Sequence, residues 1–210
     1  MEFKTRRDII VKIPNWTLAV FIISIVTYAI PSLRHLLIYD RDAIIAGQLW
    51  RLLTSHFVHF SIAHLFYNLL VFCIAGSLIE NRGYRSFGTL CFLTAFFISI
   101  TLFIAKPDMS YYGGLSGIAC GAVVYLILFE FLDSSLWTAF FCIVILLSII
   151  VKLVIEALTG QFIFVASNTL FVPIPLSHIT GSLVALIFFC IGLISVPSQS
   201  KISKEMICRE

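Results

Sequence analysis

Six apolar runs of nearly membrane-spanning length constrain the fold of this chain more than any other feature. About 20 consecutive apolar residues are enough for an α-helix to cross a bilayer. A helix also satisfies its own backbone hydrogen bonds, which lipid cannot do. We therefore expect an all-α membrane protein, a bundle of six transmembrane helices in a single domain. The runs comprise residues 16–33, 57–79, 87–105, 115–132, 136–158 and 176–196.

The composition excludes other classes. Of the 210 residues 60% are hydrophobic and 12% charged, against roughly 25% charged in an average soluble domain. The net charge is only +3, and the basic residues do not line one face, so nucleic-acid binding is not expected. Five of the six cysteines lie inside apolar runs without metal-ligand spacing, so we expect no disulfide framework, metal or cofactor.

The basic residues predict the orientation. Cytoplasmic segments of membrane proteins are enriched in Lys and Arg, so three basic segments are placed there: a tail (1–15), the turn after the second run, and a tail (197–210), flanking a membrane domain (16–196). The starts of the second, fourth and sixth runs then face outward, to the periplasm if this is a bacterial inner-membrane protein. The nine basic residues, of 14 in all, are Lys4, Arg6, Arg7, Lys12, Arg82, Arg85, Lys201, Lys204 and Arg209.

Polar residues gather where the second run begins. His64 and Asn68 are four residues apart, so they share one helix face and offer hydrogen-bond donors to a single point. The structural alternative is that they join neighbouring helices by hydrogen bonds. A hydrophilic group at the same place is expected to hydrate a cavity open to the outside. That group is Ser55, His56, His59 and Ser61.

A glycine-rich segment with a serine begins the fourth run. Residues 113–117 read Gly-Gly-Leu-Ser-Gly. Ser116 is expected in the first turn of a helix, where free backbone N–H groups favour a developing negative charge. Alternatively, Gly113, Gly114 and Gly117 form a small-residue packing face, and Ser116 only caps the helix.

A histidine enters the start of the sixth run. His178 is followed three residues later by Gly181, which lets another helix approach closely. His178 alone is more simply a packing residue. However, His64, Ser116 and His178 share one predicted depth, and a nucleophile, a base and a set of donors are what acyl transfer requires. No obvious aspartate holds His178, so packing at Gly117 and Gly181 is expected to orient it.

Lys152 and Glu156 lie one helical turn apart near the outer end of the fifth run. One interpretation is a self-neutralising ion pair at the membrane edge. The other is that Glu156 orients a polar group or lines a path for water.

Together these motifs resemble the rhomboid intramembrane serine proteases. The similarity covers about residues 48–185 and rests on Trp50-Arg51, on residues 59–68 (HFSIAHLFYN), on residues 113–117 (GGLSG) and on residues 177–181 (SHITG). It implies a six-helix rhomboid core that cleaves transmembrane segments of substrate proteins near the outer face.

The resemblance also implies roles for residues. Ser116 matches the nucleophile and His178 the general base. His64 and Asn68, with the Ser116 N–H, match the groups that stabilise the oxyanion, and Gly114 matches the glycine of the active-site loop. Rhomboids often carry a Tyr one turn after the serine, where this chain has Cys120. We expect support for the site from Gly113, Gly117, Gly181, His59 and Cys120, with Glu156 as an auxiliary residue.

Residues 152–160 (KLVIEALTG) and the compact size resemble the rhombosortase branch. Its members are thought to process surface proteins with a C-terminal tail that carries a Gly-Gly motif. Two other classes stay open: a rhomboid-like protein that binds membrane helices without cutting them, and a small proton-coupled transporter in which the histidines form a proton path.

Overall fold

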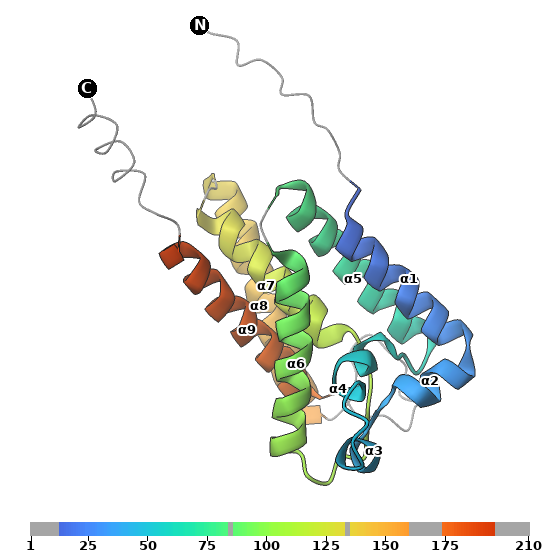
Figure 1. Cartoon of the computed structure of the whole chain (residues 1–210). Helices are drawn as coiled ribbons and strands as arrows, with labels where there is room; N and C mark the ends of the chain where they lie inside the picture. Colours follow the sequence, from blue (N-terminus) through green and yellow to red (C-terminus); the bar gives the residue numbers. More distant parts are fainter. Residues whose placement is uncertain (1–12, 84–85, 133–134, 160–173, 196–210) are drawn as a thin grey trace, which may run out of the picture.

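The computed structural model of this chain describes residues 13–83, 86–132, 135–159 and 174–195. Six long helices form a bundle (Figure 1), and each overlaps one of the predicted apolar runs. The all-α membrane bundle is thereby confirmed. Most of the predicted tail 1–15, the whole predicted tail 197–210 and residues 160–173 lie outside the described residues. The helices are α1 (Asn15–Ala29), α5 (Ile62–Asn81), α6 (Phe87–Ala105), α7 (Ser116–Leu132), α8 (Leu136–Thr159) and α9 (Pro175–Ser195).

The lengths of the helices support a multi-pass membrane protein. Among the described residues, α5, α6, α8 and α9 are long and apolar enough to cross a bilayer. A fifth crossing is counted if α1 and the short α2 (Pro31–Leu37) form one bent span, and α7 is apolar but has 17 residues. Six crossings and two cytoplasmic termini therefore stay predictions.

Two predicted helix boundaries were wrong for local reasons. The run 16–33 is not one helix: α1 ends at Ala29, and α2 begins at Pro31 after a bend of 112°. Proline lacks the N–H that would continue the helix and holds the preceding Ile30 in an extended conformation. The second run becomes helical at Ile62 rather than at residue 57, because the Ser61 side chain accepts a hydrogen bond from the His64 N–H (3.1 Å) and caps α5.

Short elements tie the segment between α1 and α5 to the loop before α7. The strand β1 (Tyr39–Asp40) pairs antiparallel with β2 (Tyr111–Tyr112). The buried guanidinium of Arg51 donates to the carbonyl oxygens of His35 (3.0 Å) and Ile38 (2.7 Å). Arg51 thereby holds the segment before β1, and the pairing of β1 with β2 holds the chain that leads into α7. The other short elements are α3 (Arg41–Ile45), α4 (Arg51–Thr54) and the 3-10 helix η1 (Ser55–Phe57).

The helices α7 and α9 pack with their backbones almost touching. A Cβ atom added to Gly181 would collide with the carbonyl oxygen of Gly117, and one added to Gly117 would lie 2.8 Å from the carbonyl oxygen of Ser177. Only glycine permits this approach. The helix α8 is peripheral by contrast, since Cys142 and Glu156 are its only buried residues.

Candidate functional site

The three helices that carry the predicted site begin at the same end of the bundle. The starts of α5, α7 and α9 lie on the side of α2, α3 and α4 (Figure 1). Gly114 contacts His64 of α5, and Gly117 contacts Ser177 of α9. Ser116 is thus flanked by two contact points that connect its loop to the histidine-bearing ends of both neighbouring helices.

His64 and Asn68 point at the backbone just before Ser116. Gly114 has φ +140°, a conformation that side chains rarely adopt. A Cβ atom there would lie 3.0 Å from His64 Cε1, 3.1 Å from His64 Nε2 and 3.9 Å from Asn68 Nδ2. Glycine therefore leaves open the small space on which both side chains converge.

The side-chain amide of Asn68 is a buried hydrogen-bond donor without an acceptor in the described residues. Its Nδ2 atom has no hydrogen-bond partner within the described part of the chain. Buried polar atoms are nearly always paired, so such an atom calls for an explanation. Because Asn68 faces Gly114, a group bound beside Ser116 would meet this donor.

Ser116 is half-buried and is the first residue of α7, where backbone N–H groups are free of helical partners. In the described residues the structure records no hydrogen bond between its hydroxyl and His178. Catalytic hydrogen bonds are often long in free enzymes and tighten when substrate binds. The contact between Gly117 and Ser177 keeps the two residues on adjoining backbone.

His178 has a carboxylate beside its ring. Its Nδ1 atom lies 3.7 Å from Glu156 Oε2, and Lys152 Nζ lies 2.7 Å from the same oxygen. The ion pair suggested by the sequence is therefore present, and Glu156 also faces a polar group. The sequence offered no obvious acid for His178, and only the packing of α8 on α9 brings one to it.

The hydrophilic group predicted to hydrate a cavity is largely buried in the protein, and its hydration stays a prediction. Ser55, His56 and His59 are fully buried. His56 Nε2 lies 2.9 Å from the carbonyl oxygen of Ala95, and His59 Nδ1 lies 3.1 Å from that of Phe57. Burial lowers the pKa of His56 to about 4 and that of His59 to about 3. Both are therefore neutral, and His56 Nδ1 and His59 Nε2 have no hydrogen-bond partner among the described residues. The His59 ring rests edge-on against His64, with centroids 5.1 Å apart.

Cys120 reaches His178 through an intermediary. Its Sγ atom lies 3.3 Å from the Ser182 hydroxyl, which donates to the carbonyl oxygen of His178 (2.9 Å). Cys120 therefore contacts the chain that carries the histidine. Gly113 lies against Val58, whose carbonyl oxygen would be 3.1 Å from an added Cβ.

Tyr112 is a site residue that the sequence reasoning missed. Its buried hydroxyl donates to the carbonyl oxygen of Gly114 (3.4 Å), and its ring packs edge-on against His56 at 5.7 Å. Burial raises the pKa of Tyr112 to about 12. The available signal was its position directly before the glycine pair.

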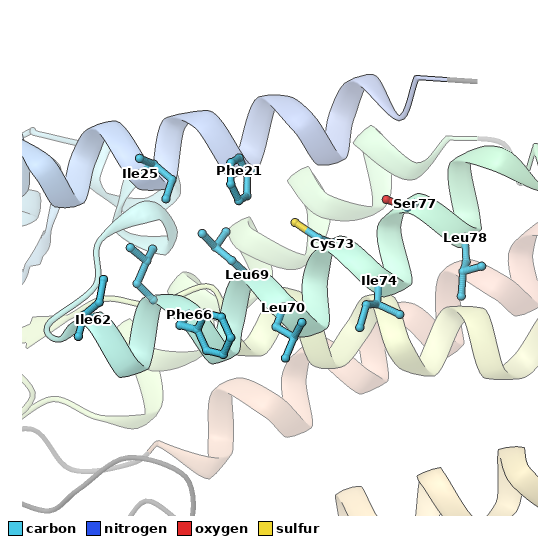
Figure 2. Close-up of a pocket in the computed structure, with 11 residues that line it drawn as sticks. Phe21, Ile25, Ile62, Phe66, Leu69, Leu70, Cys73, Ile74, Ser77 and Leu78 are labelled. Carbon is cyan, nitrogen blue, oxygen red and sulfur yellow. The ribbon is translucent and has the colours of Figure 1, made fainter. Parts of the chain in front are cut away.

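An apolar groove lies apart from these residues. It runs between α1 and α5 with a volume of about 780 Å³ (Figure 2). Among its eleven lining residues only Cys73 and Ser77 carry a heteroatom in the side chain. The groove therefore has the chemistry of a surface for hydrocarbon and not of a reaction centre.

Comparisons with known proteins agree with the motifs. A family model described as the rhomboid domain matches residues 46–195, which include every predicted site residue. A relative described as rhomboid protease GlpG, from Serratia proteamaculans (strain 568), is 31% identical over 116 residues. That alignment covers 52% of this chain and 41% of the relative, so the chain matches less than half of the relative's length.

Proposed function

Because the chain belongs to the rhomboid family, we propose that it is an intramembrane serine endopeptidase that cleaves transmembrane segments of other proteins. One observation carries this proposal. The glycine contacts bring the loop of Ser116 against His64 and Asn68 on one side and against the start of α9, with His178, on the other.

In the proposed reaction His178 is the general base. Neutral imidazole takes the hydroxyl proton of Ser116 as the oxygen attacks a substrate carbonyl, and returns it to the leaving amine. Water then hydrolyses the acyl-enzyme with the same histidine as base. The close packing of Gly117 and Gly181 supports this role, because it leaves the two helices little freedom to shift.

The oxyanion of the tetrahedral intermediate would be met by three donors: the backbone N–H of Ser116 and the side chains of His64 and Asn68. The unpartnered Nδ2 of Asn68 supports this assignment. A donor without a partner in the free enzyme can bind the charge that develops in the transition state. It therefore lowers the barrier more than a donor that already has a hydrogen-bond partner.

The substrate helix must unwind at the cut site, because an intact helix hides its carbonyls in its own hydrogen bonds. Glycine weakens a helix. The resemblance of residues 152–160 to the rhombosortase branch supports, as the substrate class, surface proteins with a C-terminal Gly-Gly tail. Together with the distribution of basic residues, it favours a bacterial inner membrane with the site on the periplasmic face.

A fluorophosphonate probe tests the nucleophile. The wild-type protein should be labelled, and Ser116→Ala should abolish labelling. Ser148→Ala is the matched control, because this exposed serine only donates to the carbonyl oxygen of Val144 within α8. Labelling that survives in Ser116→Ala would contradict the assignment.

Co-expression tests the reaction and the substrate class. A surface protein with a Gly-Gly tail should lose that tail with the wild type and keep it with His178→Ala. Cleavage of other transmembrane segments, with the Gly-Gly tail left intact, would support the protease activity and contradict the assignment to the rhombosortase branch. Proton flux in liposomes without any label on Ser116 would favour the transporter instead.

A further inference from the structure

We propose that Glu156 is a positioning residue for His178, and that its carboxylate holds the imidazole with the proton on Nδ1. The inference rests on the proposed function, because it assigns the orientation of the general base. In this arrangement Nε2 is left without a proton and is free to take the one from Ser116.

The distance between Glu156 and His178 supports the proposed hydrogen bond. Glu156 Oε2 lies 3.7 Å from His178 Nδ1, and Nδ1 has no hydrogen-bond partner among the described residues. A charge-assisted N–H···O bond is about 2.7–2.9 Å long. A shift of about 1 Å, by rotation of two side chains, would close it. When His178 becomes an imidazolium, the carboxylate would stabilise the new charge.

The burial of Glu156 indicates that its carboxylate serves more than the ion pair with Lys152. Most of α8 is exposed, yet Glu156 is only 2% exposed. A carboxylate that needed only Lys152 could remain at the lipid boundary with it, since the Lys152 side chain is 30% exposed. Burial of the carboxylate costs desolvation free energy. The buried carboxylate lies beside the His178 ring.

The charges around His178 fit this arrangement. Lys152 and Glu156 face it from α8, His64 from α5, and the neutral Cys120 lies nearby on α7. The contact of 2.7 Å with Lys152 Nζ holds the Glu156 carboxylate in position. Among these groups Glu156 is the anion that can accept from Nδ1.

Inactivation kinetics with a fluorophosphonate measure the effect. Glu156→Gln should lower kinact about 10- to 100-fold and leave KI unchanged, less than the ~10⁴-fold loss when a Ser-His-Asp triad loses its carboxylate charge. Glu156→Asp should recover part of the rate. Glu130→Gln is the matched control, because Glu130 pairs with Arg82 at the other end of the bundle, and it should keep the wild-type kinact.

A double variant separates positioning from a structural ion pair. Lys152→Met with Glu156→Gln removes both charges, so no buried charge is left unpaired. If Glu156 positions His178, this variant stays as slow as Glu156→Gln. If the pair is only structural, the rate returns to that of the wild type, which would overturn the proposal. Thermal unfolding of each variant reports on folding.

A measurement on the wild-type protein does not depend on how the variants fold. ¹⁵N NMR of histidine-labelled protein, with His178→Ala identifying the resonance, should show His178 protonated on Nδ1. Protonation on Nε2 would overturn the proposal. If wild-type Ser116 is not labelled by the probe, the proposed function fails and this inference fails with it. If Ser116 is labelled and Glu156→Gln reacts at the wild-type rate, only the role of Glu156 fails.

Discussion

The two ends of the helix bundle differ in whether their polar groups have hydrogen-bond partners. At the end where α1 begins, Glu80 accepts hydrogen bonds from the backbone N–H (2.8 Å) and hydroxyl (2.7 Å) of Thr17, and Arg82 pairs with Glu130. At the end where α7 and α9 begin, several buried nitrogens of the described residues have no hydrogen-bond partner. They include Asn68 Nδ2, His178 Nδ1, His56 Nδ1 and His59 Nε2.

The difference indicates what each end contributes. A polar group in a membrane protein costs free energy unless it is paired. The paired groups stabilise the contact of α1 with α5 and that of α5 with α7. The unpaired ones cost stability but stay available to a bound group. Substitutions at the first end should therefore lower stability, and those at the second end should lower reactivity.

The largest effect is expected where stability and reactivity depend on the same contact. Gly181→Val places side-chain atoms against the Gly117 carbonyl, so it should lower the free energy of unfolding by about 1–3 kcal/mol. It should also slow labelling of Ser116 by about 100-fold or more, because a shift of about 1 Å misplaces His178. Gly192→Val is the control, since an added Cβ there meets no atom within 4 Å. Equal behaviour of the two variants would contradict the importance of this contact.

Asn68→Ala should separate reactivity from stability. The loss of one oxyanion donor typically slows the reaction about 10²–10³-fold. The melting temperature should change little, because Nδ2 has no partner to lose among the described residues. Substrate cleavage and thermal unfolding in detergent measure the two effects. A large fall in melting temperature at full activity would assign Asn68 to packing.

Glu80→Ala should show the reverse behaviour. It removes an acceptor of the Thr17 N–H and hydroxyl and of the Trp16 N–H. The free energy of unfolding should fall by about 1–3 kcal/mol, because donors on the buried Thr17 lose their acceptor, while Ser116 labelling is kept. Asp108→Asn, on an exposed residue, is the control and should change neither. Lost labelling in a folded Glu80→Ala protein would break the distinction between the two ends.

A smaller effect is expected from mild acid. His56 and His59 have pKa values lowered by burial to about 4 and about 3, below the unfolded value near 6.5. Between these values the unfolded chain binds protons that the folded chain does not. Stability is therefore full above about pH 6.5 and falls as the pH drops, by no more than about 1 kcal/mol for each histidine between pH 7 and pH 6.

Thermal unfolding across this interval checks the effect, and His59→Phe should make the dependence on pH shallower. A melting temperature that stays constant from pH 7 to pH 5, or rises as the pH falls, would contradict it.

Much of the fold could be predicted because its cause is local. Long apolar runs can satisfy their backbones in lipid only as helices, so the positions of α5 to α9 followed from hydropathy. The start of α5 at Ile62 and the bend at Pro31 also have local causes, a capping serine at Ser61 and a proline. Pairing of β1 with β2 was not foreseeable, since each strand has two residues and forms only when the helices bring the segments together.

The candidate site divides in the same way. Spacing alone placed His64 and Asn68 on one helix face. The glycines around Ser116 and near His178 predicted that their helices approach each other closely. The burial of His56 and His59 depends on which segments cover them, so the sequence alone could not predict it. Tyr112 gains its place from the pairing of β2 with β1 and from its contact with His56, and Glu156 from its contact with His178. All of these join segments far apart in the chain.

The sequence by itself determined the membrane bundle, the order of its helices and the residue types that acyl transfer needs, because hydropathy and helical periodicity are local properties. Only the tertiary structure decided which polar atoms are paired and which are not. It leaves Asn68 Nδ2 without a partner in the described chain and sets the carboxylate of Glu156 beside His178. The physical reason is that α8 and α9 meet through packing, and no spacing within either helix encodes which side chains then face each other.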